Sequence, residues 1–191
     1  MTMTAAPTDS GQLSWTDRDQ RRLEWAAWFF TAAVLVHNAD HVRRNAGNLA
    51  HDVFAAGTAA MLVEVTVVTL VFWRHRWAPA VAALAGASLA AGYVLVHFTP
   101  ARGWLSDSLL STSHLVSIGA AGLETTAAIV LGAVGADIYW RNKTTTTTTG
   151  TPTVTAGDAD WRQVMTHPAV VLMAAGNAIM LVISVVQLAT R

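Results

Sequence analysis

Long apolar stretches dominate this chain and limit the folds that it can adopt. Five of them approach the roughly 20 residues that a helix needs to cross a bilayer. They cover residues 23–42, 53–73, 77–98, 113–140 and 169–189. Of the 191 residues, 53% are hydrophobic and only 13% are charged, which is too apolar for an average soluble domain. The sequence therefore predicts an all-α, polytopic membrane protein with five spans.

Polar segments divide the chain into four parts. Residues 1–20 form a polar N-terminal tail, and residues 21–143 hold the first four spans as a transmembrane core. Residues 144–167 begin with a run of threonines, which is typical of a flexible linker because it has little capacity to pack. Residues 168–191 then supply a fifth, peripheral span.

The Lys and Arg residues of the short loops predict the orientation, because these residues accumulate on the cytoplasmic side. A cytoplasmic N-terminus places eight of the 12 Lys and Arg residues inside and four outside. Tryptophans at the inner ends of the spans agree with this choice, since they favour the membrane interface. We expect a multi-pass plasma-membrane protein with a cytoplasmic N-terminus and an extracytoplasmic C-terminus.

The charge and the cysteine count exclude several kinds of site. The formal net charge is zero, which gives no reason to expect a nucleic-acid partner. Without any cysteine, the chain has no disulfides, thiolate metal sites or cysteine nucleophiles. Any metal site must use imidazole and oxygen ligands. The expected partners are the lipid bilayer and, through faces of small residues, further subunits in a homo- or hetero-oligomer.

Small side chains at helical spacing mark candidate helix contacts, because close backbone approach stabilises helix pairs in lipid. The third span carries three of them, and two further pairs share a face with a glutamate. These groups are Ala82, Gly86 and Ala90; Gly57 and Ala60 with Glu64; and Ser117 and Ala121 with Glu124. The alternative is that small residues are simply common in alanine-rich membrane helices.

Histidines and aspartates gather near the outer ends of the expected spans. His37, Asp40 and His41 share one helical face because they occupy positions i, i+3 and i+4. Ionisable groups at membrane depth are costly and usually face a protein interior or a water-filled cavity. The expected topology brings His97 and His114 to the same level. We predict that these five residues hold a divalent transition metal ion such as zinc, copper or iron.

Three alternatives to this metal site stay open. Arg43 and Arg44 could instead neutralise Asp40 in an internal salt bridge, which would weaken the case for a metal. A b-type haem could take its axial histidines from two different helices. The histidines could also be interfacial residues that bind nothing.

Two glutamates form a second layer beneath the histidines. Glu64 lies eleven residues from Val53, and Glu124 lies eleven residues from Ser113. With a rise of about 1.5 Å per residue, both would lie about 16 Å deep, near the middle of the hydrocarbon core. Two carboxylates at one depth can share a proton, bind a cation or relay protons. The alternative is that each glutamate is protonated and has a structural role.

A family resemblance rests on three motifs: residues 37–44 (HNADHVRR), residues 106–108 (SDS) and Glu124. Together they resemble uncharacterised actinobacterial integral membrane proteins. The resemblance covers the first four spans, implies a four-helix core and implies no known activity. The mixture of His, Asp and Ser near the outer face is also similar to the membrane metal hydrolases that include alkaline ceramidases, which have seven helices and a fuller set of ligands.

Three functions follow as hypotheses. The leading one is a non-enzymatic protein that binds or conducts a cation, either a transition metal or a proton, with Glu64 and Glu124 as its pathway. The second is a small membrane enzyme, such as a metal-dependent lipid hydrolase or a b-haem redox protein. The third is a structural subunit of a membrane complex.

Overall fold

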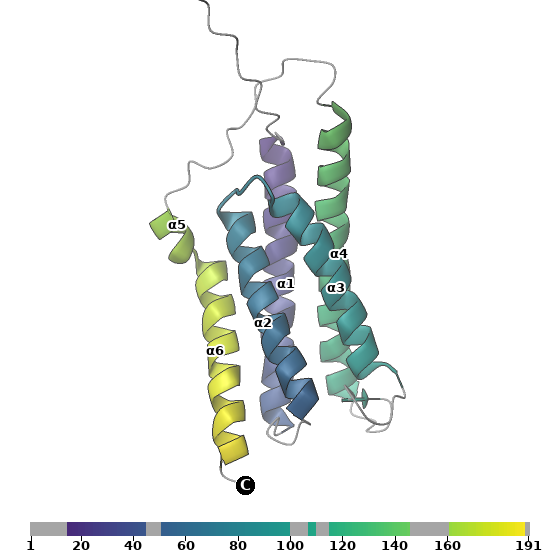
Figure 1. Cartoon of the computed structure of the whole chain (residues 1–191), viewed down its shortest axis with the longest axis vertical. Helices are drawn as coiled ribbons and strands as arrows, with labels where there is room; N and C mark the ends of the chain where they lie inside the picture. Colours follow the sequence, from purple (N-terminus) through teal and green to yellow (C-terminus); the bar gives the residue numbers. More distant parts are fainter. Residues whose placement is uncertain (1–14, 45–50, 100–106, 110–114, 146–160, 190–191) are drawn as a thin grey trace, which may run out of the picture.

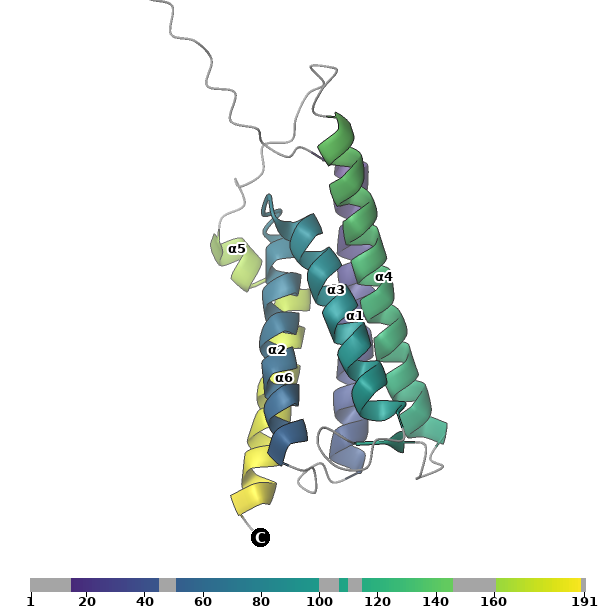
Figure 2. The same ribbon diagram turned by 45° about the vertical axis from the view of Figure 1, so that its right-hand side comes forward.

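The computed structural model describes residues 15–44, 51–99, 107–109, 115–145 and 161–189, and the regular structure within these ranges is helical throughout. The helices are α1 (Asp17–Arg43), α2 (His51–Phe72), α3 (Ala78–His97), α4 (Leu115–Thr145), α5 (Trp161–Met165) and α6 (Pro168–Ala189). The long helices lie side by side along one axis, with the short α5 at one end of α6 (Figure 1). The chain runs in one direction in α1 and α3 and in the other in α2 and α4 (Figure 2). The predicted all-α fold is confirmed.

Three helices in the described part of the chain are long and apolar enough to cross a membrane: Asp52–Phe72, Ala78–His97 and Leu115–Lys143. The apolar stretch found in α6, Pro168–Ile183, is shorter. In α1, only 15 residues separate Glu24 from Asp40. They extend over about 22 Å, less than the roughly 30 Å of a hydrocarbon core. The protein thus has three candidate spans, and the five-span arrangement with a four-helix core stays a prediction.

Large apolar side chains are exposed along the long helices. The following are more than half exposed on α2, α3, α4 and α6, respectively: Leu62, Leu84, Ile129 and Val182. In water, apolar surface of this extent would favour aggregation or a partner. In a bilayer the same surface would face acyl chains, so this distribution agrees with a membrane location.

Polar contacts stabilise the first turn of α1, and the histidines lie at the other end of this helix. Thr16 and Asp19 form a capping box, in which the Thr16 hydroxyl accepts a hydrogen bond from the Asp19 amide at 3.2 Å. Arg141 of α4 donates to Asp19 Oδ1 at 2.9 Å. Burial on its own would raise the pKa of Asp19, but the hydrogen bonds from Arg141 and Thr16 outweigh it and hold this pKa below its usual value. The contact ties α1 to α4.

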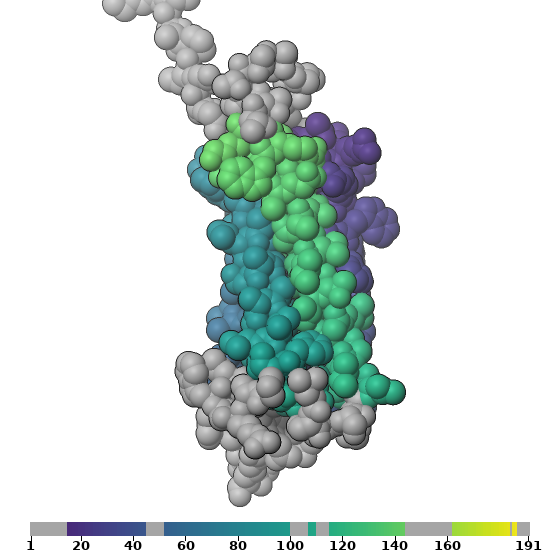
Figure 3. Space-filling view, turned by 90° about the vertical axis from the view of Figure 1, so that its right-hand side faces the viewer, coloured from purple at the N-terminus to yellow at the C-terminus, as the bar shows by residue number. Residues whose placement is uncertain are grey.

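Glycines allow α3 and α4 to pack closely. A Cβ on Gly86 would lie 2.5 Å from the Ala128 carbonyl oxygen, and one on Gly135 would lie 2.6 Å from the Pro79 carbonyl oxygen. Figure 3 shows the two helices in contact over much of their length. The predicted helix contact at Gly86 is confirmed, whereas Gly135 was not singled out in the sequence.

Most of the buried polar side chains lie in the half of the bundle that holds the histidines. Away from the histidines, the large fully buried side chains include Leu23, Phe30, Val67, Val71, Leu131 and Ile138. The other half buries polar side chains, among them His37, Asp40, His41, Glu64, His97, Ser117, Glu124 and Asn177. Burial of polar groups is costly unless they find partners. A functional site is therefore expected in this polar half.

Candidate metal centre

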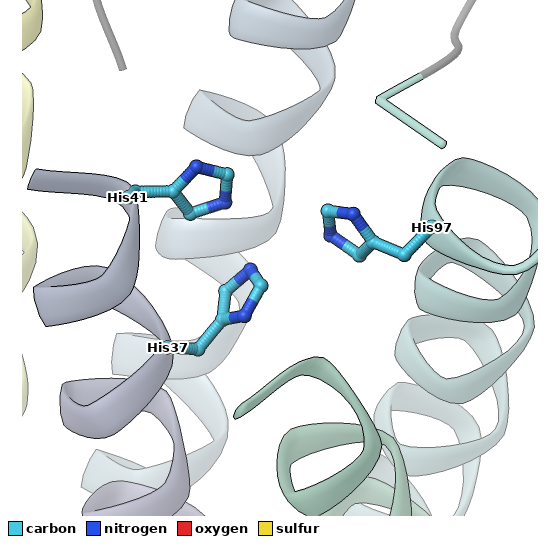
Figure 4. A group of neighbouring side chains, drawn as sticks. All are labelled: His37, His41 and His97. Carbon is cyan, nitrogen blue, oxygen red and sulfur yellow. The ribbon is translucent and has the colours of Figure 1, made fainter. Parts of the chain in front are cut away.

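Three histidines from α1 and α3 meet at one end of the bundle. His37 and His41 lie one turn apart on α1, and His97 is the last residue of α3. Each offers one ring nitrogen that lies within 4.8 Å of those of the other two. Figure 4 shows the three rings turned toward a common space. Two nitrogens held by one zinc ion at about 2.0–2.1 Å lie at most about 4.2 Å apart, so a small inward shift of the rings would let them share an ion.

The three imidazoles are buried and lie against one another. His37, His41 and His97 are 4%, 8% and 4% exposed. The ring centroid of His37 lies 4.4 Å from that of His41 and 4.9 Å from that of His97. Positive charge on all three rings would be repulsive at this spacing, and a metal ion requires the neutral form. The cluster could therefore hold a metal ion.

Asp107 lies behind His97. Its backbone carbonyl oxygen is 3.3 Å from Nδ1 of His97, and its carboxylate oxygen Oδ2 is 3.6 Å away. A proton on Nδ1 would be donated to this carbonyl and would leave Nε2 of His97 free. Metal-binding histidines commonly donate their second ring N–H to a carbonyl or carboxylate in this way. Asp107, which the sequence singled out only within the motif at residues 106–108, is therefore placed to orient a candidate ligand.

Arg44 lies behind His41. Its Nη2 is 3.2 Å from Nδ1 of His41 and 3.1 Å from Oδ2 of Asp107. Because arginine can only donate, Nδ1 of His41 is the acceptor of this contact. If Nε2 of His41 bound a metal, the proton of the neutral ring would lie on Nδ1. Arg44 would then have to lose its contact with Nδ1, and it would keep only its hydrogen bonds to carboxylates.

Asp40 is bound by two arginines of its own helix. Arg43 donates to Oδ1 from Nη2 at 2.7 Å, and Arg44 donates to Oδ2 from Nε at 2.9 Å. Arg43 also donates to the Ser117 hydroxyl at 3.0 Å, which links α1 to α4. This is the internal salt bridge that the sequence left open as an alternative. Asp40 is not one of the three groups whose ligand atoms converge, and it holds Arg44 beside them.

The two glutamates singled out in the sequence meet in the interior. Glu64 of α2 and Glu124 of α4 are 3% and 2% exposed and line the same cavity. The Tyr93 hydroxyl of α3 donates to Oε1 of Glu64 at 2.7 Å, and Asn177 of α6 donates to Oε2 at 3.0 Å. Asn38 of α1 in turn donates to Oδ1 of Asn177 at 2.9 Å. The helix α6, which the sequence placed at the periphery, therefore takes part in this network.

Glu124 lies between this network and the histidines. Its Oε2 is 3.5 Å from Nε2 of His37, and its carboxyl group also interacts with the Tyr93 hydroxyl. In the described part of the chain, Oε2 of Glu124 and Nδ1 of His37 are buried atoms without a hydrogen-bond partner. Such an atom costs on the order of 1–3 kcal/mol. A buried water molecule or a metal ion could supply the missing partners.

A cavity of about 300 Å³ adjoins the three histidines and both glutamates. It lies mainly between α2 and α3, and Gly57 and Gly92 are part of its wall. A Cβ on either glycine would meet no atom within 4 Å. The expectation that Gly57 marks a close helix contact is therefore wrong, because the missing side chain leaves open space beside Glu64.

Not every predicted site residue falls within this arrangement. His114 lies outside the described residues, so its role as a ligand stays a prediction. Tyr93 and Asn177 contact Glu64 but were assigned no role from the sequence. Each carried a signal, since Tyr93 lies one turn from His97 and Asn177 is an isolated amide in an apolar stretch.

Comparisons of the chain with models of protein families, with curated proteins and with solved structures gave no match. The resemblance to actinobacterial membrane proteins stays a prediction.

Proposed function

We propose that the protein is an integral membrane protein that binds a divalent transition metal ion through His37, His41 and His97. The observation that carries this proposal is the convergence of three buried imidazoles from two helices, with ligand atoms within 4.8 Å of one another. Imidazole ligands favour zinc, copper or iron, whereas magnesium and calcium prefer oxygen ligands. Zinc is the natural first probe because it accepts tetrahedral sites with nitrogen and oxygen ligands.

The proposed setting is the plasma membrane, with the metal centre at the extracytoplasmic end of the bundle. The three candidate spans and the exposed apolar side chains support a membrane location. The distribution of Lys and Arg supports a cytoplasmic N-terminus. In this proposal α1 and α6 complete a set of five spans.

Below the metal, we propose that Glu64 and Glu124 bind a proton or a second cation and form a pathway from the site. Both carboxyl groups line one cavity, and both interact with the Tyr93 hydroxyl. Double ionisation of two buried carboxyl groups is disfavoured, so the pair would hold a proton or a cation. A metal at His37 would bring positive charge close to Glu124 and favour the anionic form of this glutamate. Occupancy of the two layers would then be linked.

A small metal-dependent hydrolase is the second candidate, and one observation favours it. Three histidine ligands leave a coordination position open, as in catalytic zinc sites, where the ion activates a water molecule. Glu124, whose Oε2 has no hydrogen bond among the described residues, lies close enough to the cluster to act as a general base. A b-type haem fits less well, because the three rings crowd into one space instead of facing each other across a flat macrocycle (Figure 4).

The test is elemental analysis and an absorption spectrum of detergent-purified protein. Stoichiometric zinc in the wild type, lost in His97→Ala and kept in His75→Ala, supports the proposal. The His75→Ala control removes an imidazole from the turn between α2 and α3, at the other end of the bundle. A Soret band would select haem. Absence of both signals in a protein that copurifies with other subunits would overturn the proposal in favour of a structural role.

A further inference from the structure

We infer that the cavity beside the histidines binds a neutral amphiphile with an apolar chain and a hydroxyl head, which enters from the side of the bundle between α2 and α3. This inference deepens the proposed function and rests on it, because the bound metal would hold the head group.

The walls of the cavity suit an apolar chain. Its lining includes Val53, Phe54 and Met61 of α2 and Leu89 and Val96 of α3. Its volume of about 300 Å³ lies at the lower end of the range for small-molecule sites. Apolar walls with a few polar groups gathered at one end are the usual form of such sites. A ligand with an apolar chain and one polar end matches these apolar walls and their polar end.

The cavity reaches the outer surface of the bundle between α2 and α3. Val63 of α2 and Ser88 of α3 both line it, and both are also exposed at the surface. In a membrane this surface faces acyl chains. A molecule dissolved in the bilayer would therefore reach the cavity without crossing water.

The polar end of the cavity selects the head group. It presents the three imidazoles and two glutamates, and no Lys or Arg is among the described residues that line it. An anionic head would meet the carboxyl groups of Glu64 and Glu124, and an ammonium group has no lone pair to offer a metal. A hydroxyl group has both a lone pair and a proton. Its oxygen can bind the metal while its proton is donated to Oε2 of Glu124, which has no hydrogen-bond partner among the described residues.

The test uses zinc-loaded protein in phosphatidylcholine vesicles and a long-chain alcohol that carries a diazirine next to its hydroxyl group. Irradiation should label peptides of α2 and α3 around Gly57 and Gly92. The matched methyl ether cannot donate a hydrogen bond, and its labelling should be about tenfold weaker, the effect of losing roughly one buried hydrogen bond. Removal of zinc with a chelator should weaken labelling by the alcohol in the same direction.

Glycine variants test the location of the binding site. Gly57→Leu and Gly92→Leu place a side chain in the cavity, and no atom within 4 Å opposes the new Cβ. Each should reduce labelling by about tenfold, because the side chain takes up the space of several methylene groups. Gly119→Leu is the matched control on α4, where a Cβ also meets nothing within 4 Å and the residue does not line the cavity. It should label like the wild type.

The outcomes separate this inference from the proposed function. If the glycine variants retain zinc but lose labelling while Gly119→Leu does not, the inference is supported. Labelling that is insensitive to both cavity glycines, or that spreads over the lipid-facing side of α4, overturns it even when zinc is bound. Equal labelling by the alcohol and its ether overturns the assignment of the head group. A wild type without zinc overturns the proposed function, whatever the labelling pattern.

Discussion

Oε2 of Glu124 lies 3.5 Å from Nε2 of His37, so the buried carboxyl layer and the histidine cluster are in direct contact. The glutamate comes from the N-terminal third of α4 and the histidine from the last two turns of α1. If Nδ1 of His37 bound a metal, a carboxylate at this distance could accept a hydrogen bond from the Nε2–H group. Such hydrogen bonds strengthen histidine ligands at other metal sites. The carboxylate can equally move toward the ion and become a ligand.

Glu124→Gln keeps the shape of the side chain and removes its charge. Zinc affinity should fall by about 10–100-fold, as for other carboxylates behind a metal-binding histidine. Competition titration with a chromophoric chelator measures this change. Glu24→Gln is the matched control, because Glu24 lies toward the other end of α1 and interacts with Gln20 and Arg74 rather than with the site. Equal zinc affinities in Glu124→Gln and the wild type would remove Glu124 from the metal centre.

Gly86→Leu should destabilise the bundle. The new Cβ would lie 2.5 Å from backbone atoms of α4, which cannot move without separating the two helices. The expected loss is about 1–3 kcal/mol or more, visible as a lower Tm in detergent. Gly92→Leu on the same helix should stay within about 0.5 kcal/mol of the wild type, since open space surrounds its Cβ. Equal melting temperatures for the two variants would contradict the packing of α3 on α4.

Asp19, at the start of α1, stabilises the folded protein by an amount that depends on pH. Its pKa is lowered in the folded protein, because the hydrogen bonds from Arg141 and Thr16 outweigh the effect of burial. Its stabilising effect is therefore complete above the usual aspartate pKa and is lost as the pH falls through the folded value. Asp19→Asn should lower Tm at neutral pH, and the difference from the wild type should shrink under acid conditions. A difference in Tm that does not depend on pH would exclude this linkage.

Reporter fusions test the proposed orientation. Fusions after Arg76 and Lys143 should report the cytoplasm, and a fusion after Arg191 should report the exterior, because the positively charged loops then lie inside. A cytoplasmic C-terminus would contradict the five-span topology. The other two fusions would then determine on which side of the membrane the histidines lie.

The sequence predicted those parts of the site that depend on spacing within one helix. His37 and His41 share a face because they are four residues apart, and burial of Glu64 and Glu124 followed from the cost of exposing them to lipid. The apolar stretches likewise predicted α2, α3 and α4 as spans. In each case the prediction needed only the spacing or the composition of residues within one helix.

Contacts between helices could not be predicted in this way. The bond from Asn177 to Glu64 depends on the rotation of α6 against α2. The cavity at Gly57 depends on the distance between α2 and α3, and a small residue is compatible with either close packing or open space. The pairing of Asp40 with Arg43 and Arg44 was one of two alternatives, and the choice rests on side-chain geometry.

X-ray absorption at the zinc edge of zinc-loaded, detergent-purified protein tests the metal centre most directly. We expect a first shell dominated by imidazole nitrogens at about 2.0–2.1 Å, with outer-shell scattering from the rings of His37, His41 and His97. The imidazole scattering should diminish in His97→Ala and stay unchanged in His75→Ala. A first shell of oxygen atoms without imidazole scattering, or zinc that is lost on desalting, would contradict the account.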